Sequence, residues 1–464
     1  MEIERMKILL STIILTVLFN TSAWAQSCPA IAAELLGSNE IAGDQFGWSV
    51  ASEGDLVIVG TPGDQNNAGS VHVFRRDGLQ WIEEVNLVSQ DNAAGDFFGN
   101  SVSISGNIIL VGAPGDDDNG SRSGSAYIFE FDGTNWNQLV KLLPFDGNAT
   151  DFVGGWVSVS GNNAIISSER NDELGTNAGS AYIFTYDGTN WVHQVKLHPS
   201  DGEAYDSFSI SVAIDANTAV IGASEDDDNG SASGSAYIFK FDGAFWVQDA
   251  KLVPDDSNAS DFFGEAVAIS GNKVIVGSYW NDQGGINAGA AYVFVDDGTQ
   301  WTQEAKLLAS DAMPRDQFGF SVDIAGDIAI VGANNADSAE IDSGAVYLYA
   351  YDGSQWNQTL KQIPDDALEA DTFANAVAIT NEIAVIGSVN HDEMGEDSGS
   401  VYITLYNQAG PADLNTDGTL NFFDISLFLQ LFAAQDPAAD FLPDGFFNFF
   451  DISVFLQAFS AGCS

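Results

Sequence analysis

The stretch Asp96–Phe129, DFFGNSVSISGNIILVGAPGDDDNGSRSGSAYIF, contains the pattern from which most of the chain is built. An aromatic-Gly step opens it, an alternating run and a continuously apolar run follow, and an acidic, Gly-rich loop precedes a third apolar run. Alternation is typical of a half-buried strand, and a short apolar run fits a strand buried on both faces. The stretch therefore predicts three strands, with one acidic loop between the second and the third.

The same pattern returns at a spacing of about 55 residues. In the first six copies an Asp-Gly pair, which favours a tight hairpin turn, precedes a Trp-led run that predicts a fourth strand. Four short strands per repeat are typical of a β-propeller blade, because a lone four-stranded sheet cannot bury both of its faces without neighbours. The opening Asp of the repeat recurs as Asp44, Asp96, Asp151, Asp206, Asp261, Asp316 and Asp371.

The seventh copy lacks the Asp-Gly pair and the Trp strand, and a segment near the N-terminus matches the missing strand. Ile31–Phe46, IAAELLGSNEIAGDQF, aligns without a gap on Gln303–Phe318, QEAKLLASDAMPRDQF. We therefore predict an all-β fold over residues 26–406, a seven-bladed β-propeller that is closed by an N-terminal strand.

The repeat resembles the FG-GAP family, which forms the propeller of the α-integrin head and of many bacterial surface proteins. Phe46-Gly47, Phe98-Gly99, Phe263-Gly264 and Phe318-Gly319 supply the FG step, and Val111–Pro114 is the clearest GAP step. The resemblance implies a non-catalytic propeller that recognises a protein or a glycan. It also implies calcium-binding loops of the form D-x-D-x-D-G-x-x-D.

Two of the acidic loops are the strongest calcium candidates within the repeats. Several carboxylates and a Gly within one short loop are what a calcium ion requires. The loops depart from the family spacing, since Gly115 and Ser123 stand where it has Asp. The alternative is a polar turn whose side chains cap their own backbone. The predicted ligands are Asp116, Asp117, Asp118 and Asn119 in one loop, and Asp226, Asp227, Asp228 and Asn229 in the other.

After a linker at residues 407–412, two near copies of a 16-residue stretch occupy the C-terminal residues 413–464. Each copy combines an acidic loop with an apolar run that predicts a helix. The first loop places oxygen ligands at positions 1, 3, 5, 9 and 12 of an EF-hand-like spacing, with Gly418 at the sharp turn. The predicted side-chain ligands are Asp413, Asn415, Asp417, Asn421 and Asp424 in the first loop, and Asp440, Asp444, Asn448 and Asp451 in the second.

This tandem pair resembles a dockerin, a small α-helical module that folds around calcium and docks into cohesin-type receptors. The resemblance implies Ca²⁺ as a cofactor, the backbone carbonyl of Thr419 as a further ligand, and a cohesin-like or other cell-surface protein as a partner. Phe422-Phe423 and Phe449-Phe450 stand where dockerins usually carry small polar residues. We expect some of the Phe rings of this module to be exposed and to form an apolar docking patch. The alternative is that they pack on the rim of the propeller.

The ends of the chain predict export. Residues 1–25 have the pattern of a signal peptide, because ILLSTIILTVLF is too short to span a bilayer and Ala23–Ala25 fits a cleavage site. We expect a secreted or cell-surface bacterial protein with no membrane insertion after cleavage. In that oxidising compartment Cys28 and Cys463 are expected to form a disulfide.

Charge and motifs narrow the function. The 14 basic and 66 acidic residues give a net charge of −52, which argues against nucleic acid and anionic lipid as partners. No nucleophile-elbow, metalloprotease or phosphate-loop spacing occurs. We therefore predict a non-catalytic binding or adhesion protein. The alternatives are a dockerin-tethered carbohydrate-active enzyme and a purely structural surface-layer protein.

Overall fold

A computed structural model describes residues 30–78, 80–406, 414, 422–435, 439, 441 and 447–461. The larger compact unit is Ile31–Thr404, and the two C-terminal helices belong to the other unit. The predicted signal peptide, the linker and both cysteines lie outside the described residues. Within the described part, no helix has the length and apolar character needed to cross a bilayer.

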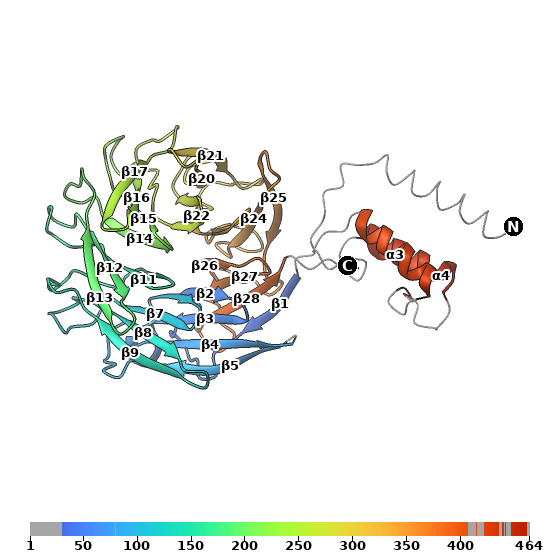
Figure 1. Ribbon diagram of the computed structural model, residues 1–464, viewed down its shortest axis with the longest axis horizontal. Helices are drawn as coiled ribbons and strands as arrows, with labels where there is room; N and C mark the ends of the chain where they lie inside the picture. Colours follow the sequence, from blue (N-terminus) through green and yellow to red (C-terminus); the bar gives the residue numbers. More distant parts are fainter. Residues whose placement is uncertain are drawn as a thin grey trace. The chain divides into compact units, whose positions relative to one another are not determined.

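Seven four-stranded antiparallel sheets surround a central axis in the larger unit (Figure 1). Blade one is β2 (Ser49–Glu53), β3 (Leu56–Thr61), β4 (Ser70–Asp77) and β5 (Gln80–Leu87), with the short α2 (Asp64–Asn67) in its middle loop. Blade two is β6 (Ser101–Ser105), β7 (Ile108–Ala113), β8 (Ser125–Phe131) and β9 (Trp136–Leu142). Blade three is β10 (Val157–Ser160), β11 (Asn163–Ser168), β12 (Ser180–Tyr186) and β13 (Trp191–Leu197). Blade four is β14 (Phe208–Asp215), β15 (Thr218–Ala223), β16 (Ser235–Phe241) and β17 (Trp246–Leu252).

The remaining three blades complete the ring. Blade five is β18 (Val267–Ser270), β19 (Lys273–Ser278), β20 (Ala290–Asp296) and β21 (Trp301–Leu307). Blade six is β22 (Phe318–Ala325), β23 (Ile328–Ala333), β24 (Ala345–Tyr351) and β25 (Trp356–Gln362). Blade seven is β26 (Phe373–Ile379), β27 (Ile383–Ser388), β28 (Ser400–Leu405) and, as its outer strand, β1 (Ala30–Leu35). The predicted closure by an N-terminal strand is therefore confirmed.

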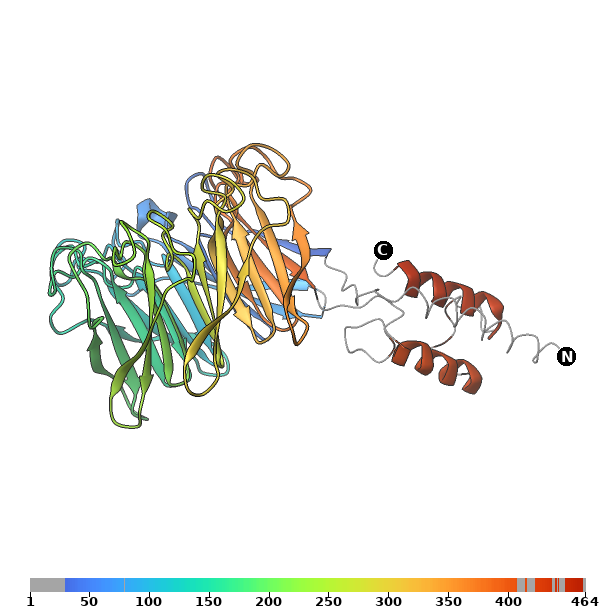
Figure 2. The same ribbon diagram turned by 90° about the horizontal axis from the view of Figure 1, so that it is seen from above.

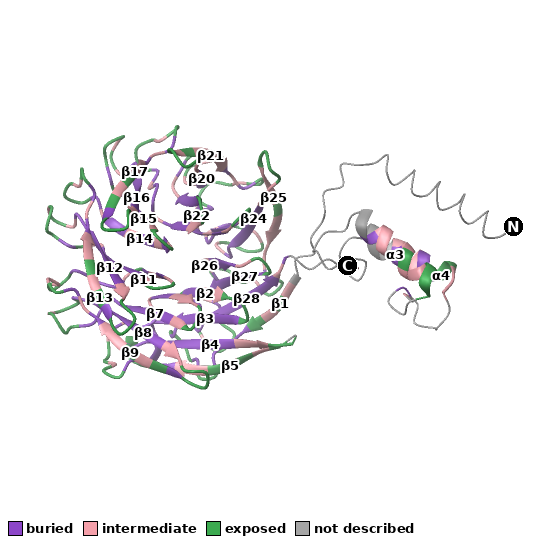
Figure 3. Ribbon diagram, in the orientation of Figure 1, coloured by how far each residue is buried: buried purple, intermediate pink, exposed green. Residues whose placement is uncertain are grey.

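The strands separate two sets of loops, which lie at opposite ends of the sheets (Figure 2). We call one end the loop face: it carries the acidic loops between second and third strands, together with the connections between blades. The other end, the hairpin face, carries the tight turns within each blade. Burial follows the sequence pattern, since the second strand of each blade is almost entirely buried and the fourth strand alternates (Figure 3).

The aromatic-Gly step belongs to the packing between blades. The Phe98 ring lies edge-on against the Tyr127 ring, 5.4 Å between centroids, and both side chains are fully buried. The neighbouring blade approaches so closely that only a glycine fits at Gly124, which has a φ of +78° and where a Cβ would lie 2.2 Å from the Val153 carbonyl oxygen. The repeated glycines and aromatics are therefore architectural.

The second unit contains α3 (Phe422–Ala434) and α4 (Phe449–Ala461). The rings of Phe428 and Phe455 stack in parallel at 3.9 Å between centroids, and Phe441 packs edge-on against both. These two helices correspond to the apolar runs of the two predicted loop-helix copies.

Candidate functional site

In the acidic loop of blade two, a lysine of the same blade lies among the predicted ligands. The Lys141 ammonium donates to the carboxylates of Asp116, Asp118 and Asp91 at 2.6, 2.7 and 2.8 Å. Burial alone would lower the pKa of Lys141, but the bonds to the three carboxylates outweigh it and raise the pKa. Lys141 is therefore the cation at the centre of this cluster.

Blade four repeats the arrangement. The Lys251 ammonium donates to Asp226, Asp228 and Asp201 at 2.8, 2.6 and 2.9 Å. The Tyr237 hydroxyl donates to the same buried Asp226 carboxylate at 2.8 Å. We call this arrangement a lysine cage: the lysine of the fourth strand together with the side-chain oxygens that accept from its ammonium.

Blades three, five and six keep the lysine and progressively lose acceptors from the acidic loop. This loss leaves the Asp of the blade connection as the constant partner of the ammonium. The bonds run from Lys196 to Asp146 (2.9 Å) and Glu173 (2.6 Å), from Lys306 to Asp256 (2.6 Å) and Asn281 (3.1 Å), and from Lys361 to Asp311 (2.6 Å).

In five blades the next Asp of the acidic loop caps the backbone. Asp117 accepts from the backbone N–H of Arg122 at 2.7 Å, five residues along the chain. The equivalent carboxylates of four other blades do the same at 2.8–2.9 Å, namely Asp172, Asp282, Asp337 and Asp392. Such local bonds are the turn alternative that the sequence left open.

The residues of these two loops do not fit a resident calcium ion. Calcium takes six to eight oxygens, but an ammonium already occupies the space between the carboxylates at Asp116 and Asp118. The peptide N–H of Asn119 donates to Ser123, which is the residue at the ninth loop position. Asp227, Asp228 and Asn229 hold the equivalent positions in blade four. Calcium at these two loops stays a prediction, and this geometry does not support it.

Blade one replaces the lysine cage with a histidine. His72 is fully buried, and its two ring nitrogens lie 2.9 Å from carboxylate oxygens of Glu40 and Glu83. Burial alone would lower the pKa of His72, but its hydrogen bonds to these two carboxylates raise the pKa to about 9. The imidazolium is therefore the internal cation of this blade at neutral pH.

Of the predicted ligands in the C-terminal unit, the structure describes Asp424, Asn448 and Asp451. Asp424 and Asp451 are both buried in the first turn of their helices. Asp424 accepts from the Leu414 N–H at 3.1 Å, and Asp451 accepts from the Asn448 N–H at 2.8 Å. Two equivalent, buried carboxylates at the last loop position fit an EF-hand-like ligand set. The other seven predicted ligands lie outside the described residues, as do Cys28 and Cys463.

The loop face of blades five, six and seven carries six large, exposed apolar side chains, and Phe145 and Tyr205 are exposed to a similar extent on connections of other blades. Each of the six is more than half exposed, and each lies on an acidic loop or on a blade connection that contacts one. The loop and the connection are joined by backbone bonds, such as Ala370 N–H to Ile341 carbonyl at 2.9 Å. We call this set the apolar rim: Ile286, Met313, Ile341, Leu368, Met394 and Ile41.

On the same face, the charges of Glu169, Glu225 and Glu265 act on one another, and those of Glu225 and Glu265 also act on Tyr279. Burial raises the pKa of both Glu169 and Glu265, and the Glu225 charge raises each further. Trp280 and Tyr279 follow β19, with their rings 5.6 Å apart. Carboxylates with perturbed pKa beside aromatic rings are a candidate site for a polar ligand such as a sugar.

The FG-GAP repeat model matches seven segments that together span most of the chain. The matched residues are 32–74, 81–129, 136–184, 191–239, 246–294, 301–349 and 356–404. The chain belongs to the FG-GAP repeat family. Its C-terminal unit falls outside the match, so the family relationship concerns the propeller.

Other comparisons add only the fold. No curated protein matches the chain. Among solved structures, "Crystal Structure of Mitotic Checkpoint Complex" contains a chain with a TM-score of 0.51 and 11% identity. The match covers 82% of this FG-GAP chain and 93% of the other. At that identity the likeness shows a shared architecture.

Neither the lysine cages nor the apolar rim of this FG-GAP propeller was predicted from the sequence. The cage lysines do recur at the repeat spacing, from Lys141 to Lys361, and this was a usable signal. The rim residues occupy loops and follow no strand or helix period, so periodicity could not have found them.

Proposed function

We propose that this protein is a secreted, non-catalytic binding protein whose propeller recognises a protein or a glycan at the apolar rim. A propeller of FG-GAP repeats suggests a binding or adhesion role. The observation that carries the choice of face is the apolar rim itself. Each of blades five, six and seven presents one pair of exposed apolar side chains, and exposed apolar surface often marks an interaction site.

The character of the rim also suits recognition. Met313 and Met394 can adapt their unbranched side chains to a partner. The surrounding acidic loops add negative charge from a chain with a net charge of −52. A partner with basic groups around an apolar centre would match this surface, and its association would weaken as salt increases.

We also propose that the C-terminal unit is a calcium-dependent, dockerin-like anchor for a cohesin-like or other cell-surface protein. Asp424 and Asp451 support this proposal, because buried carboxylates at equivalent positions of two copies suit metal binding. Phe449 and Phe450 support a docking role, since 56% and 64% of their surfaces are exposed. These two rings give the anchor an apolar contact surface.

A panel of extracellular polysaccharides and surface-protein fractions from the source cells tests the propeller. The full chain is expected to be retained by at least one member of the panel. The double substitution Ile341→Asp, Leu368→Asp should abolish that retention, because it places two charges in the rim. Phe245→Asp is the matched control, since Phe245 is 72% exposed on the hairpin face. Equal loss in both variants, or in neither, would contradict the proposed face.

The anchor has its own test. Capture of surface proteins by the full chain should require calcium and should be lost on Phe449→Ser, Phe450→Ser, while retention by the propeller's ligand persists. Capture that survives both the double substitution and calcium removal would contradict the anchor.

A second candidate function is hydrolysis of a polysaccharide on the loop face. The neighbouring carboxyl groups of Glu169, Glu225 and Glu265 favour it, because a glycosidase acts through a pair of carboxyl groups. Release of reducing sugar by the full chain, lost on Glu265→Gln and kept on Glu130→Gln, would establish this activity. Absence of release from every polysaccharide on the panel would leave binding as the function.

A further inference from the structure

Blade seven breaks the pattern of the lysine cages. In the alignment of the closing strand with blade five, Glu34 of β1 occupies the position of Lys306. Asp366 keeps the constant Asp of the blade connection, and His391 takes the position that Asp226 holds in blade four. A carboxylate has thus replaced the ammonium, while the acceptors around it remain.

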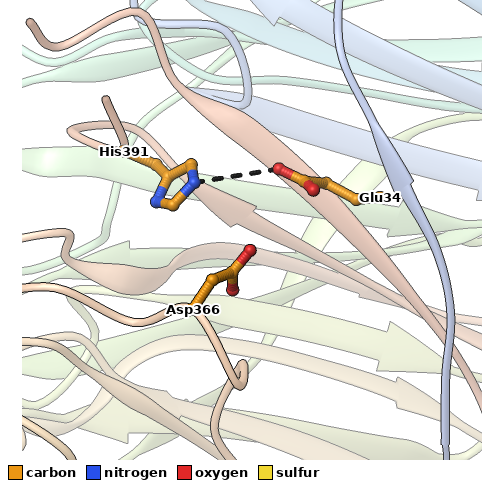
Figure 4. A group of neighbouring side chains, drawn as sticks. All are labelled: Glu34, Asp366 and His391. Atoms are coloured by element: carbon orange, nitrogen blue, oxygen red, sulfur yellow. Dashed lines mark ion pairs between the residues drawn. The ribbon is translucent and has the colours of Figure 1, made fainter. Parts of the chain in front are cut away.

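The three side chains converge on one point from three elements (Figure 4). Glu34 comes from β1, Asp366 from the connection before β26, and His391 from the loop after β27. One ligand atom of each lies within 4.8 Å of the others. The His391 Nε2 atom and the nearer Glu34 oxygen are 3.8 Å apart, which is too long for a hydrogen bond.

The hydrogen bonding and burial of His391 suit a metal ligand. His391 is 2% exposed, and its Nδ1 lies 3.1 Å from a carboxylate oxygen of Asp371, which is itself buried. Its Nε2 is buried and has no hydrogen-bond partner among the described residues. Metal-binding histidines commonly donate the other ring N–H to a carboxylate, which fixes the tautomer and directs the free nitrogen at the metal.

The charges around His391 also favour a bound cation. The charged groups that act on His391 are the carboxylates of Asp371, Asp366 and Glu34. In blades two to six the equivalent Asp bonds to a lysine ammonium. Here Asp366 accepts from the Tyr402 hydroxyl at 3.2 Å, and Glu34 accepts from Ser400 at 2.8 Å. The Glu34 oxygen that accepts from Ser400 is the one nearest to His391 Nε2, and a carboxylate oxygen that accepts one hydrogen bond keeps a further lone pair for a cation.

We propose that Glu34, Asp366 and His391 bind a divalent transition-metal ion of the zinc type, which ties the closing strand β1 to the body of blade seven. Zinc bonds to imidazole nitrogen and carboxylate oxygen at about 2.0–2.2 Å, so its ligands lie roughly 3.4 Å apart, slightly closer than Nε2 and the Glu34 oxygen are here. One imidazole among three ligands favours zinc over calcium, which prefers six or more oxygens.

Zinc content of the full chain tests the site. The chain is stripped with a chelator and dialysed against zinc in excess calcium, which occupies sites that prefer calcium. After gel filtration, zinc is counted per chain. Glu34→Lys restores the residue of five other blades, and His391→Asn restores the residue of blades three and five, so both variants should fold. Each is expected to hold one zinc fewer than the unaltered chain.

Further variants separate a built site from nonspecific binding to an acidic surface. Asp311→Asn removes an equivalent carboxylate in blade six and should leave the zinc content unchanged. Asp371→Asn should weaken zinc binding by about 10- to 100-fold, as expected for the partner of a ligating histidine. Zinc should also raise the melting temperature of the unaltered chain and not that of Glu34→Lys. Equal zinc content in the unaltered chain, Glu34→Lys and His391→Asn would overturn the proposal. A His391 imidazole that carries a proton on both nitrogens in the zinc-dialysed chain would also overturn it, because Nε2 could then not bind zinc.

Discussion

Lys251 and Lys361 occupy the same position of the repeat but neutralise different numbers of carboxylates. Lys251 bonds to three, of which Asp226 is buried, whereas the Lys361 bond goes to the half-exposed Asp311. Both ammonium groups lie over a tyrosine ring, at 5.1 and 5.5 Å. A comparison of Lys251 with Lys361 therefore measures how much the additional carboxylate bonds contribute to stability.

Replacing Lys251 by Met should lower the free energy of unfolding by about 2–3 kcal/mol, because a buried carboxylate loses its partner. Lys361→Met should lower it by no more than about 1 kcal/mol, as for an exposed ion pair. Urea unfolding followed by tryptophan fluorescence measures both. Equal losses in the two variants would contradict the account of the cages.

His72 should make stability depend on pH. Its folded pKa of about 9 lies above the unfolded value of 6.5, so its contribution is present below pH 6.5 and is lost as pH rises through 9. The shift corresponds to about 3 kcal/mol. The free energy of unfolding should fall over this window in the unaltered chain and much less in His72→Gln. The same pH profile in both would argue against a buried imidazolium.

The closing strand β1 is the element on which the ring depends. Leu35 of β1 is buried, as is Leu142 of β9, which holds the equivalent position in blade two. Truncating either to Ala should cost about 2–4 kcal/mol, but only the change in β1 loosens the ring closure. In hydrogen exchange, Leu35→Ala should increase exchange in β28. Leu142→Ala should increase it in β8. Unchanged exchange in β28 of Leu35→Ala would contradict this role of β1.

The strands and blades could be predicted because their sequence signals are local. The lysine cages could not, because their residues come from distant parts of the sequence. The alternating and apolar runs, the Asp-Gly turns and the match between Ile31–Phe46 and blade five located the blades and the closing strand. The cage of Lys141 joins residues 50, 25 and 23 positions away, on a connection and a loop. Only the fold brings these together, so the sequence did not show that a lysine ammonium lies among the carboxylates for which it predicted calcium. Ser209 and Ala374 stand where the other five blades have the Gly of this step, and both residues keep its positive φ, so the backbone of the FG step is retained without the glycine.

At the scale of the whole molecule, the two units should respond differently to calcium. The propeller has its own cations in blades one to six, whereas the C-terminal unit carries the EF-hand-like spacing. In calorimetry of the metal-stripped full chain, added calcium should raise the transition of the C-terminal unit and leave the larger propeller transition in place. A calcium-dependent shift of the propeller transition would instead support calcium binding by the acidic loops.

Recognition at the apolar rim is the central claim, and hydrogen exchange of the full chain with and without its panel ligand tests it most directly. The account predicts slower exchange in the rim loops, residues 284–289, 339–344 and 394–399, and in the connections that carry Met313, Leu368 and Ile41. The hairpin turns at 132–135 and 242–245 should be unchanged. Protection confined to the hairpin face, or no ligand retained by the chain, would contradict the claim.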